Sequence, residues 1–218
     1  MAERRIERRM TAILAADVAG YSRLMGQDEE GTLAHLKAHR RELVNPKVRE
    51  HRGRIVKTTG DGLLVEFASP VEAVRCAVEV QRGMVDRNAA TPEDRRIRFR
   101  VGINLGDVIA DDGDLFGDGV NVAARLEGLS EPGGLCISQI VWEQVRDKLP
   151  YAFEDAGERE VRRIPEQIGE ARHLEGRAKI AKCPTHWAGE VGCDGVKHDR
   201  LRARAHMLLI QPTLSTHG

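Results

Sequence analysis

The stretch Arg54–Phe67, RIVKTTGDGLLVEF, is the part of the sequence that decides the fold. Two runs of β-favouring residues flank Gly60–Gly62 (GDG), and an Asp-Gly pair between such runs is typical of a tight hairpin. Two other segments supply neighbours for this hairpin. Thr11–Val18, TAILAADV, is a short apolar run containing one acid and predicts a buried strand. Arg96–Asn104, RIRFRVGIN, alternates strictly between apolar and basic residues and predicts a strand with one buried face.

Helical patterns separate these strands. Residues 28–44 carry leucines at helical spacing behind Asp28, a residue type that caps helices. Ser69–Glu72, SPVE, has the sequence of a capping box with a proline in the first turn. Later segments predict a turn at 106–107, strands at 108–110, 135–137 and 151–153, and helices over 119–129 and from residue 138. This order predicts an α+β fold, a ferredoxin-like βαββαβ sheet with extra C-terminal β/α elements and helices mainly on one face.

The composition excludes several classes of protein. The 218 residues hold 34 Lys+Arg and 34 Asp+Glu, so no net positive charge attracts nucleic acid. No apolar run approaches the roughly 20 residues that a membrane span needs. The first ten residues are charged and lack the apolar core of a signal peptide. With only four cysteines, we expect a cytoplasmic protein with no membrane and no nucleic-acid partner.

Two carboxylates are candidates for a metal site. Asp17 lies at the end of an apolar strand, where a charge needs water, a cation or hydrogen-bond donors. Asp61 lies at the tip of the hairpin. If the first strand neighbours that hairpin, the two acids converge, and their hard oxygens suit Mg²⁺ or Mn²⁺. The alternative is structural: Asp61 is a turn residue and Asp17 a helix cap.

Two further side chains are candidates for binding an anion, and a lysine bears on where the metal site lies. Asn121 and Arg125 are four residues apart on a predicted helix, so they share a face that can hold a phosphate. A solvated helix face is the alternative. Lys57 precedes Asp61 by four residues and lies on the same side if the strand is regular. Because this lysine would compete with a cation, the pattern favours sites assembled from two chains.

Four ordered segments together resemble the catalytic domain of class III nucleotidyl cyclases. The resemblance extends over about residues 8–165 and is specific, since several motifs occur in order at the family's spacing. The segments are Ile13–Asp17 with Gly20–Ser22, Lys57–Gly62, Gly102–Val108 and Asp114–Glu127.

The resemblance implies a role for each candidate. Asp17 and Asp61 resemble the metal-binding pair, and Lys57 and Asp114 the pair that reads the purine, with a combination typical of adenylyl cyclases. Asn121 would orient the ribose, and Arg125 would stabilise charge on the α-phosphate. The implied reaction converts ATP to 3′,5′-cyclic AMP and pyrophosphate with two Mg²⁺ or Mn²⁺ ions per site. In this family the sites are shared between the two chains of a dimer, so we expect a homodimer.

The resemblance weakens toward the C-terminus. Arg162 or its neighbour Arg163 lies where the family holds the terminal phosphates, and we choose Arg162. We expect a cyclase domain over residues 1–168 and a divergent, poorly ordered tail over 169–218. In the tail, Cys183, His186, Cys193 and His198 have a spacing that could ligate zinc, although disorder is the preferred interpretation. The irregular end leaves two alternatives to an adenylyl cyclase: a catalytically silent nucleotide-binding regulatory module and, more weakly, a guanylyl cyclase.

Overall fold

The computed structural model describes residues 7–151, 153–160 and 177–182, and these all lie in the first compact unit of the chain, residues 1–187. Its centre is a six-stranded sheet in the order β2-β3-β1-β4-β5, with β6 parallel to β4. Each of the first four strands in this order is antiparallel to its neighbour, which is the ferredoxin-like arrangement that the sequence predicted. The strands are β1 (Glu7–Val18), β2 (Arg54–Thr59), β3 (Gly62–Phe67), β4 (Phe99–Asp111), β5 (Asp114–Phe116) and β6 (Leu135–Ile137).

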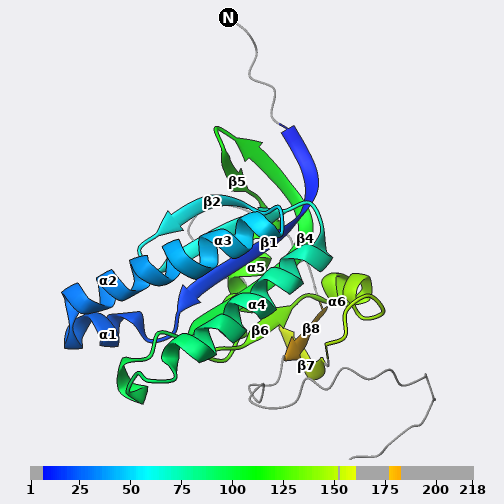
Figure 1. The fold of residues 1–218 in the computed structure, drawn as a ribbon. Coiled ribbons are helices and arrows are strands. Elements are labelled where there is room, and N and C mark those ends of the chain that lie inside the picture. Colours follow the sequence, from blue (N-terminus) through cyan, green and yellow to red (C-terminus); the bar gives the residue numbers. More distant parts are fainter. Residues whose placement is uncertain (1–6, 152, 161–176, 183–218) are drawn as a thin grey trace, which may run out of the picture. The chain divides into compact units, whose positions relative to one another are not determined.

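Helices cover the sheet unequally. The α1–α4 segments and α6 contribute to the larger core on one face, while α5 packs on the other, and Figure 1 shows α4 lying across the sheet. The prediction that helices lie mainly on one face is therefore confirmed. The helices are α1 (Tyr21–Gln27), α2 (Glu29–His39), a π-helical segment (Arg40–Val44), α3 (Asn45–Glu50), α4 (Pro70–Asn88), a 3₁₀ turn (Glu93–Arg95), α5 (Asp118–Leu129) and α6 (Gln139–Val145).

Strand alternation decides which residues meet α5. In β4, Phe99, Val101 and Ile103 are buried in the larger core, as the alternating pattern predicted. Their neighbours Arg100 and Gly102 point to the opposite face because successive side chains alternate. In β1 the same alternation places Ile13 and Ala15 in the smaller core with α5. Asp17 follows them in the same register and therefore faces the α5 side of the sheet.

Strand β4 differs from its prediction at both ends. It begins at Phe99, so residues 96–98 lie outside the strand, and it continues through Gly106 and Asp107 to Asp111. The predicted turn at 106–107 is absent because β1 begins at Glu7 and pairs with β4 along this whole length. The real turn is Asp112–Gly113, where both residues have positive φ, as a two-residue hairpin loop requires.

Two other local predictions are wrong. α4 begins after Ser69 as predicted, but the capping box does not form: the Ser69 side chain makes no cap hydrogen bond, and the Glu72 carboxylate contacts Nδ1 of His51 at 2.7 Å. The strand expected at 151–153 begins only at Glu154. This strand, β7 (Glu154–Glu160), pairs with β8 (Arg177–Lys182) in a separate two-stranded sheet. The cap at Asp28 is confirmed: its Oδ1 accepts a hydrogen bond from Gly31 N at 2.9 Å.

The domain boundary expected at residue 168 stays a prediction, with β8 lying beyond it. Within the described ranges, no helix has both the length and the apolar character of a membrane span. The four residues of the zinc-like pattern lie outside the described residues.

Candidate functional site

Asp17 is held by an arginine from the neighbouring strand. It lies directly opposite Arg100 in the β1–β4 register, so both side chains project from the same face. Nε of Arg100 donates to Oδ1 of Asp17 at 2.9 Å, and the second guanidinium nitrogen donates to Oδ2. The carboxylate is thus compensated by a cation of its own chain. Asp17 caps no helix, since α1 begins after Gly20.

Asp61 approaches the end of the same strand from the β2–β3 hairpin. Its Oδ2 accepts a hydrogen bond from the backbone N–H of Val18 at 3.3 Å, next to Asp17 in the chain. β1 pairs directly with β3, which brings the hairpin tip to the end of β1. The structure therefore brings together the two acids that the sequence singled out.

A third carboxylate, Glu127 of α5, completes this cluster. Its side chain is 16% exposed, and one oxygen lies 3.5 Å from Arg100 Nη2. Burial, followed by the negative charge of Asp17 and a hydrogen bond with it, raises the pKa of Glu127 to about 7. Three acids thus lie close to Arg100, and Asp61 also lies near the guanidinium of Arg40, which donates to Gly62 O at 3.1 Å. The cluster offers carboxylate oxygens, the ligand type that divalent cations prefer.

Lys57 and Asp114 form a second centre. Lys57 Nζ donates to Asp114 Oδ2 at 3.0 Å, and the hydrogen bond from Lys57 lowers the pKa of Asp114. The backbone N–H of Leu115 donates to the other carboxylate oxygen at 2.9 Å. The pair presents one ammonium donor and one carboxylate acceptor side by side on the surface. The predicted alignment of Lys57 with Asp61 is wrong, because β2 ends at Thr59 and Asp61 lies in the turn after it, so Lys57 reaches β5 while Asp61 contacts the end of β1.

Asn121 and Arg125 project from α5 away from the acids. At about 100° per residue, Arg125 and Glu127 are about 200° apart around the helix axis. Glu127 faces Asp17, so Arg125 points to the other side, and Asn121, one turn earlier, shares its face. Asn121 is exposed and Arg125 half-buried. In the described part of the chain no carboxylate forms an ion pair with Arg125.

Close packing fixes the height of α5 above the sheet. A Cβ on Gly102 of β4 would lie 2.2 Å from Glu127 N and 2.3 Å from Ala123 O. At the start of the helix, the buried amide of Asn104 donates to Gly119 O at 3.1 Å. These contacts set the positions of Asn121, Arg125 and Glu127 together.

Comparison with known proteins decides the family. Residues 6–179 match the family described as "Adenylate and Guanylate cyclase catalytic domain". The chain belongs to this family. A solved structure, "Adenylate/Guanylate Cyclase/Hydrolase from Silicibacter pomeroyi", is 45% identical with a TM-score of 0.73, covering 82% of this chain and 98% of that one.

Curated relatives of this cyclase domain are longer proteins. "Putative adenylate cyclase 3" of Rhizobium meliloti is 51% identical over 168 residues, which make up 77% of this chain and 29% of that protein. An "Adenylate cyclase" of Streptomyces coelicolor is 30% identical, over 66% of this chain and 36% of its own length. The chain thus spans only about a third of these relatives.

Another acidic group of the cyclase domain lies apart from this site. Single ligand atoms of Glu50, His51 and Glu79 lie within 4.8 Å of one another. The Lys47 ammonium already contacts Glu50 at 2.9 Å and Glu79 at 2.7 Å, so the position of a cation is taken by a side chain. Arg162, expected to hold the terminal phosphates, lies outside the described residues.

Sequence reasoning missed Arg100 and Glu127. The alternation of Arg96–Asn104 did place Arg100 on a polar face, but only the β1–β4 register shows that it meets Asp17. Glu127 follows Arg125 by two residues. It differs from the other polar residues of α5 only in lying on the side of the helix that packs on the sheet. No local sequence pattern predicts either contact.

Proposed function

We propose that the chain is an adenylyl cyclase that converts ATP to 3′,5′-cyclic AMP and pyrophosphate at sites shared between the two chains of a homodimer. Each site takes Asp17 and Asp61 from one chain. Lys57, Asp114, Asn121 and Arg125 come from the other. The relatives named adenylate cyclase support this activity.

One observation carries the shared-site proposal: Arg125 and Asn121 point away from the acids of their own chain. A single chain cannot bring that face of α5 to Asp17, because Glu127, on the other side of the helix, already occupies the sheet side. A second copy in head-to-tail orientation supplies the missing half. The exposed apolar side chains of Met10, 64% exposed, and Phe116, 50% exposed, are compatible with a surface that another chain covers.

The acid cluster fits divalent cations. Asp17 and Asp61 provide hard oxygen ligands, and Glu127 places a third carboxyl group beside Asp17. When bound, two Mg²⁺ or Mn²⁺ ions would make the ribose 3′-hydroxyl more acidic and neutralise the leaving pyrophosphate. Asp17 and Asp61 would hold these ions at a fixed position relative to the nucleotide.

The base is read by Lys57 and Asp114. The ammonium donates to adenine N1, and the carboxylate accepts from the 6-amino group, whereas guanine presents the opposite polarity at both positions. The 3.0 Å contact between the two side chains places donor and acceptor next to each other, as this reading requires.

The remaining groups act on the sugar and the phosphates. Asn121 orients the ribose so that the 3′-oxygen attacks the α-phosphorus in line with the departing pyrophosphate. Arg125, without an ion-pair partner among the described carboxylates, stabilises the charge that develops on the α-phosphate. Arg162 holds the terminal phosphates in this proposal. Because the nucleophile belongs to the substrate, the protein mainly positions it and supplies charge.

Mixing two inactive variants tests the shared site. Asp61→Ala and Arg125→Ala chains are each expected to be inactive. In an equal mixture, random pairing forms heterodimers that hold one intact site, so about a quarter of wild-type activity returns. A mixture that stays inactive after the chains have been shown to exchange contradicts the proposal.

A second assay tests the substrate. Purified chain with Mn²⁺ and either ATP or GTP should form cyclic AMP from ATP far faster than cyclic GMP from GTP, with Asp61→Ala as the blank. Saturable ATP binding without product would instead identify a nucleotide-binding regulatory module.

A further inference from the structure

The two edges of the sheet meet at the base-reading pair. In sheet order β2 and β5 are at opposite ends, separated by β3, β1 and β4, yet residues of β2 and β5 lie in contact. Two side-chain contacts join β2 to the β4–β5 hairpin in the described part of the chain. One is the Lys57–Asp114 pair, and the other runs from Arg54 Nη1 to the carbonyl oxygen of Gly113 at 2.8 Å.

A bound base would draw on only one of these two contacts. Lys57 and Asp114 bind each other in the nucleotide-free chain, and in the proposed complex each also forms a hydrogen bond with the purine. Arg54 contacts a backbone carbonyl and needs no rearrangement. Its contact is to Gly113, directly before Asp114 in the chain, so it acts on the backbone that carries the carboxylate.

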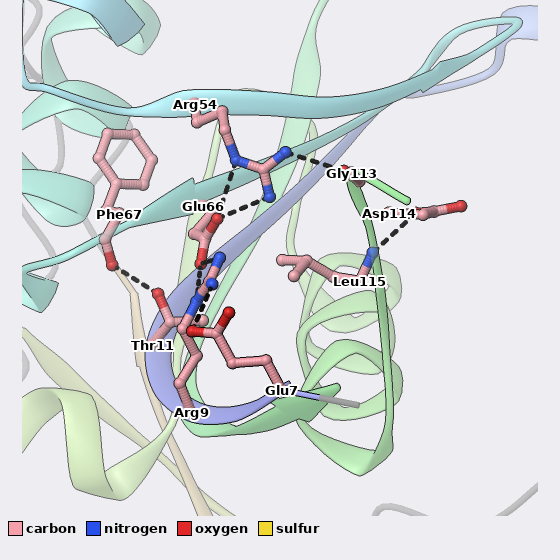
Figure 2. Close-up of polar contacts among 9 residues, drawn as sticks. All are labelled: Glu7, Arg9, Thr11, Arg54, Glu66, Phe67, Gly113, Asp114 and Leu115. Carbon is pink, nitrogen blue, oxygen red and sulfur yellow. Dashed lines mark hydrogen bonds and ion pairs between the residues drawn. The ribbon is translucent and has the colours of Figure 1, made fainter. Parts of the chain in front are cut away.

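Arg54 is itself held in place by a buried carboxylate. Figure 2 shows Glu66 between two guanidinium groups, with Arg54 on one side and Arg9 on the other. Arg54 donates from Nε and Nη2 to Oε2 of Glu66 at 3.0 and 2.7 Å, and Arg9 donates in the same way to Oε1 at 2.9 and 2.7 Å. Glu66 is 8% exposed, and all four donors come from neighbouring strands.

The Glu66 carboxylate is kept charged by this arrangement. Burial by itself raises the pKa of Glu66, but the hydrogen bonds from Arg54 and Arg9 outweigh it and hold the pKa below its usual value. Charge-assisted bonds of this kind are the stronger class of hydrogen bond. With Nε and Nη2 bound to Glu66, the guanidinium plane is fixed and Nη1 is directed at Gly113.

We propose that Arg54, anchored by Glu66, is a positioning residue for purine recognition, which holds the β4–β5 turn against β2 so that Asp114 and Lys57 remain close enough to bind the same purine. The inference rests on the proposed function, since it gives Arg54 a task in reading the base. It assigns no contact between Arg54 and the substrate.

The variant Arg54→Gln tests the proposal, with Arg75→Gln as the matched control. Arg75 has a similar exposed fraction, 44% against 45% for Arg54, and also pairs with a glutamate, but it lies on α4. Base recognition contributes equally to the bound substrate and the transition state, so its loss raises KM more than it lowers kcat. For Arg54→Gln we expect KM for ATP to rise about tenfold, the effect of one charge-assisted hydrogen bond, and the preference for ATP over GTP to fall.

Backbone amide exchange over residues 111–116 gives a readout that needs no activity. It should accelerate in Arg54→Gln and stay unchanged in Arg75→Gln. Unchanged exchange in Arg54→Gln overturns the proposal, and so does faster exchange with an unaltered ratio of ATP to GTP turnover. If the wild-type chain forms no cyclic nucleotide, the proposed function fails, and the exchange measurement still decides whether Arg54 holds the turn.

Discussion

Substituting Gly102 with alanine tests whether the height of α5 above β4 is set by backbone contact. The added Cβ would lie 2.2 Å from Glu127 N, 2.3 Å from Ala123 O and 2.8 Å from Leu126 C. An ordinary contact begins at 3.4 Å. The helix therefore has to move away by about 1 Å, because backbone atoms cannot rotate aside as a side chain can.

The size of the effect follows from this overlap. Overpacking costs about 1–3 kcal/mol, and a clash with helix backbone belongs at the upper end. At roughly 2–4 °C per kcal/mol for a chain of this size, Gly102→Ala should lower the melting temperature by about 6–12 °C. A shift of about 1 Å in α5 moves Asn121 and Arg125 and should reduce cyclase activity about 100-fold.

The control is Gly128→Ala on the same helix. A Cβ there meets nothing within 4 Å, and alanine favours a helix over glycine by about 1 kcal/mol, so this variant should melt at or slightly above the wild-type temperature. Thermal melts followed by far-ultraviolet circular dichroism, with turnover measured at 25 °C, compare the three proteins. A Gly102→Ala chain that melts within about 2 °C of wild type and keeps full activity would refute the close approach of β4 and α5.

Three further changes have defined outcomes. Because the pKa of Glu127 is raised to about 7 from 4.5, the folded state keeps this proton and loses stability as pH rises through that window. In metal-free urea titrations, Glu127→Gln should therefore gain stability relative to wild type from pH 4.5 to 7. A difference in stability that stays constant with pH contradicts this. Asn104→Ala removes the buried hydrogen bond to the carbonyl of Gly119 and should cost about 1 kcal/mol in the same titrations. A result within error of wild type would contradict this. Lys57→Met removes only an exposed ion pair, so the melting temperature should change by less than about 2 °C while KM for ATP rises; a large loss of stability would contradict a purely substrate-directed role.

Local patterns predicted the framework of the sheet. Strands form near the places that three patterns predicted: the segments beside the GDG turn, the apolar run of Thr11–Val18 and the alternation of Arg96–Asn104. Their ends were less accurate because pairing with a neighbour decides how far a strand extends. β4 continues past Gly106 since β1 offers partners as far as Glu7, and no residue within 106–107 encodes that.

Side-chain partners were predicted less well than elements. Ser69–Glu72 has the sequence of a capping box, yet Glu72 binds His51 from the preceding helical segment. A local motif indicates which hydrogen bond can form, and tertiary packing decides which of the competing hydrogen bonds does form. The same competition directed Lys57 to Asp114 rather than alongside Asp61.

The sequence alone predicted the ferredoxin-like class and most of the order of elements, and it singled out the candidate site residues, because strand alternation, turn residues and ordered motifs are properties of short segments. Only the tertiary structure decided how those residues combine. Arg100 meets Asp17 across 83 positions of the chain, and Lys57 meets Asp114 across 57. Register and sheet curvature produce these contacts, and both result from the packing of the whole core. The same packing turns Glu127 toward the acids and Arg125 away from them, and our proposal of a site built from two chains rests on that difference.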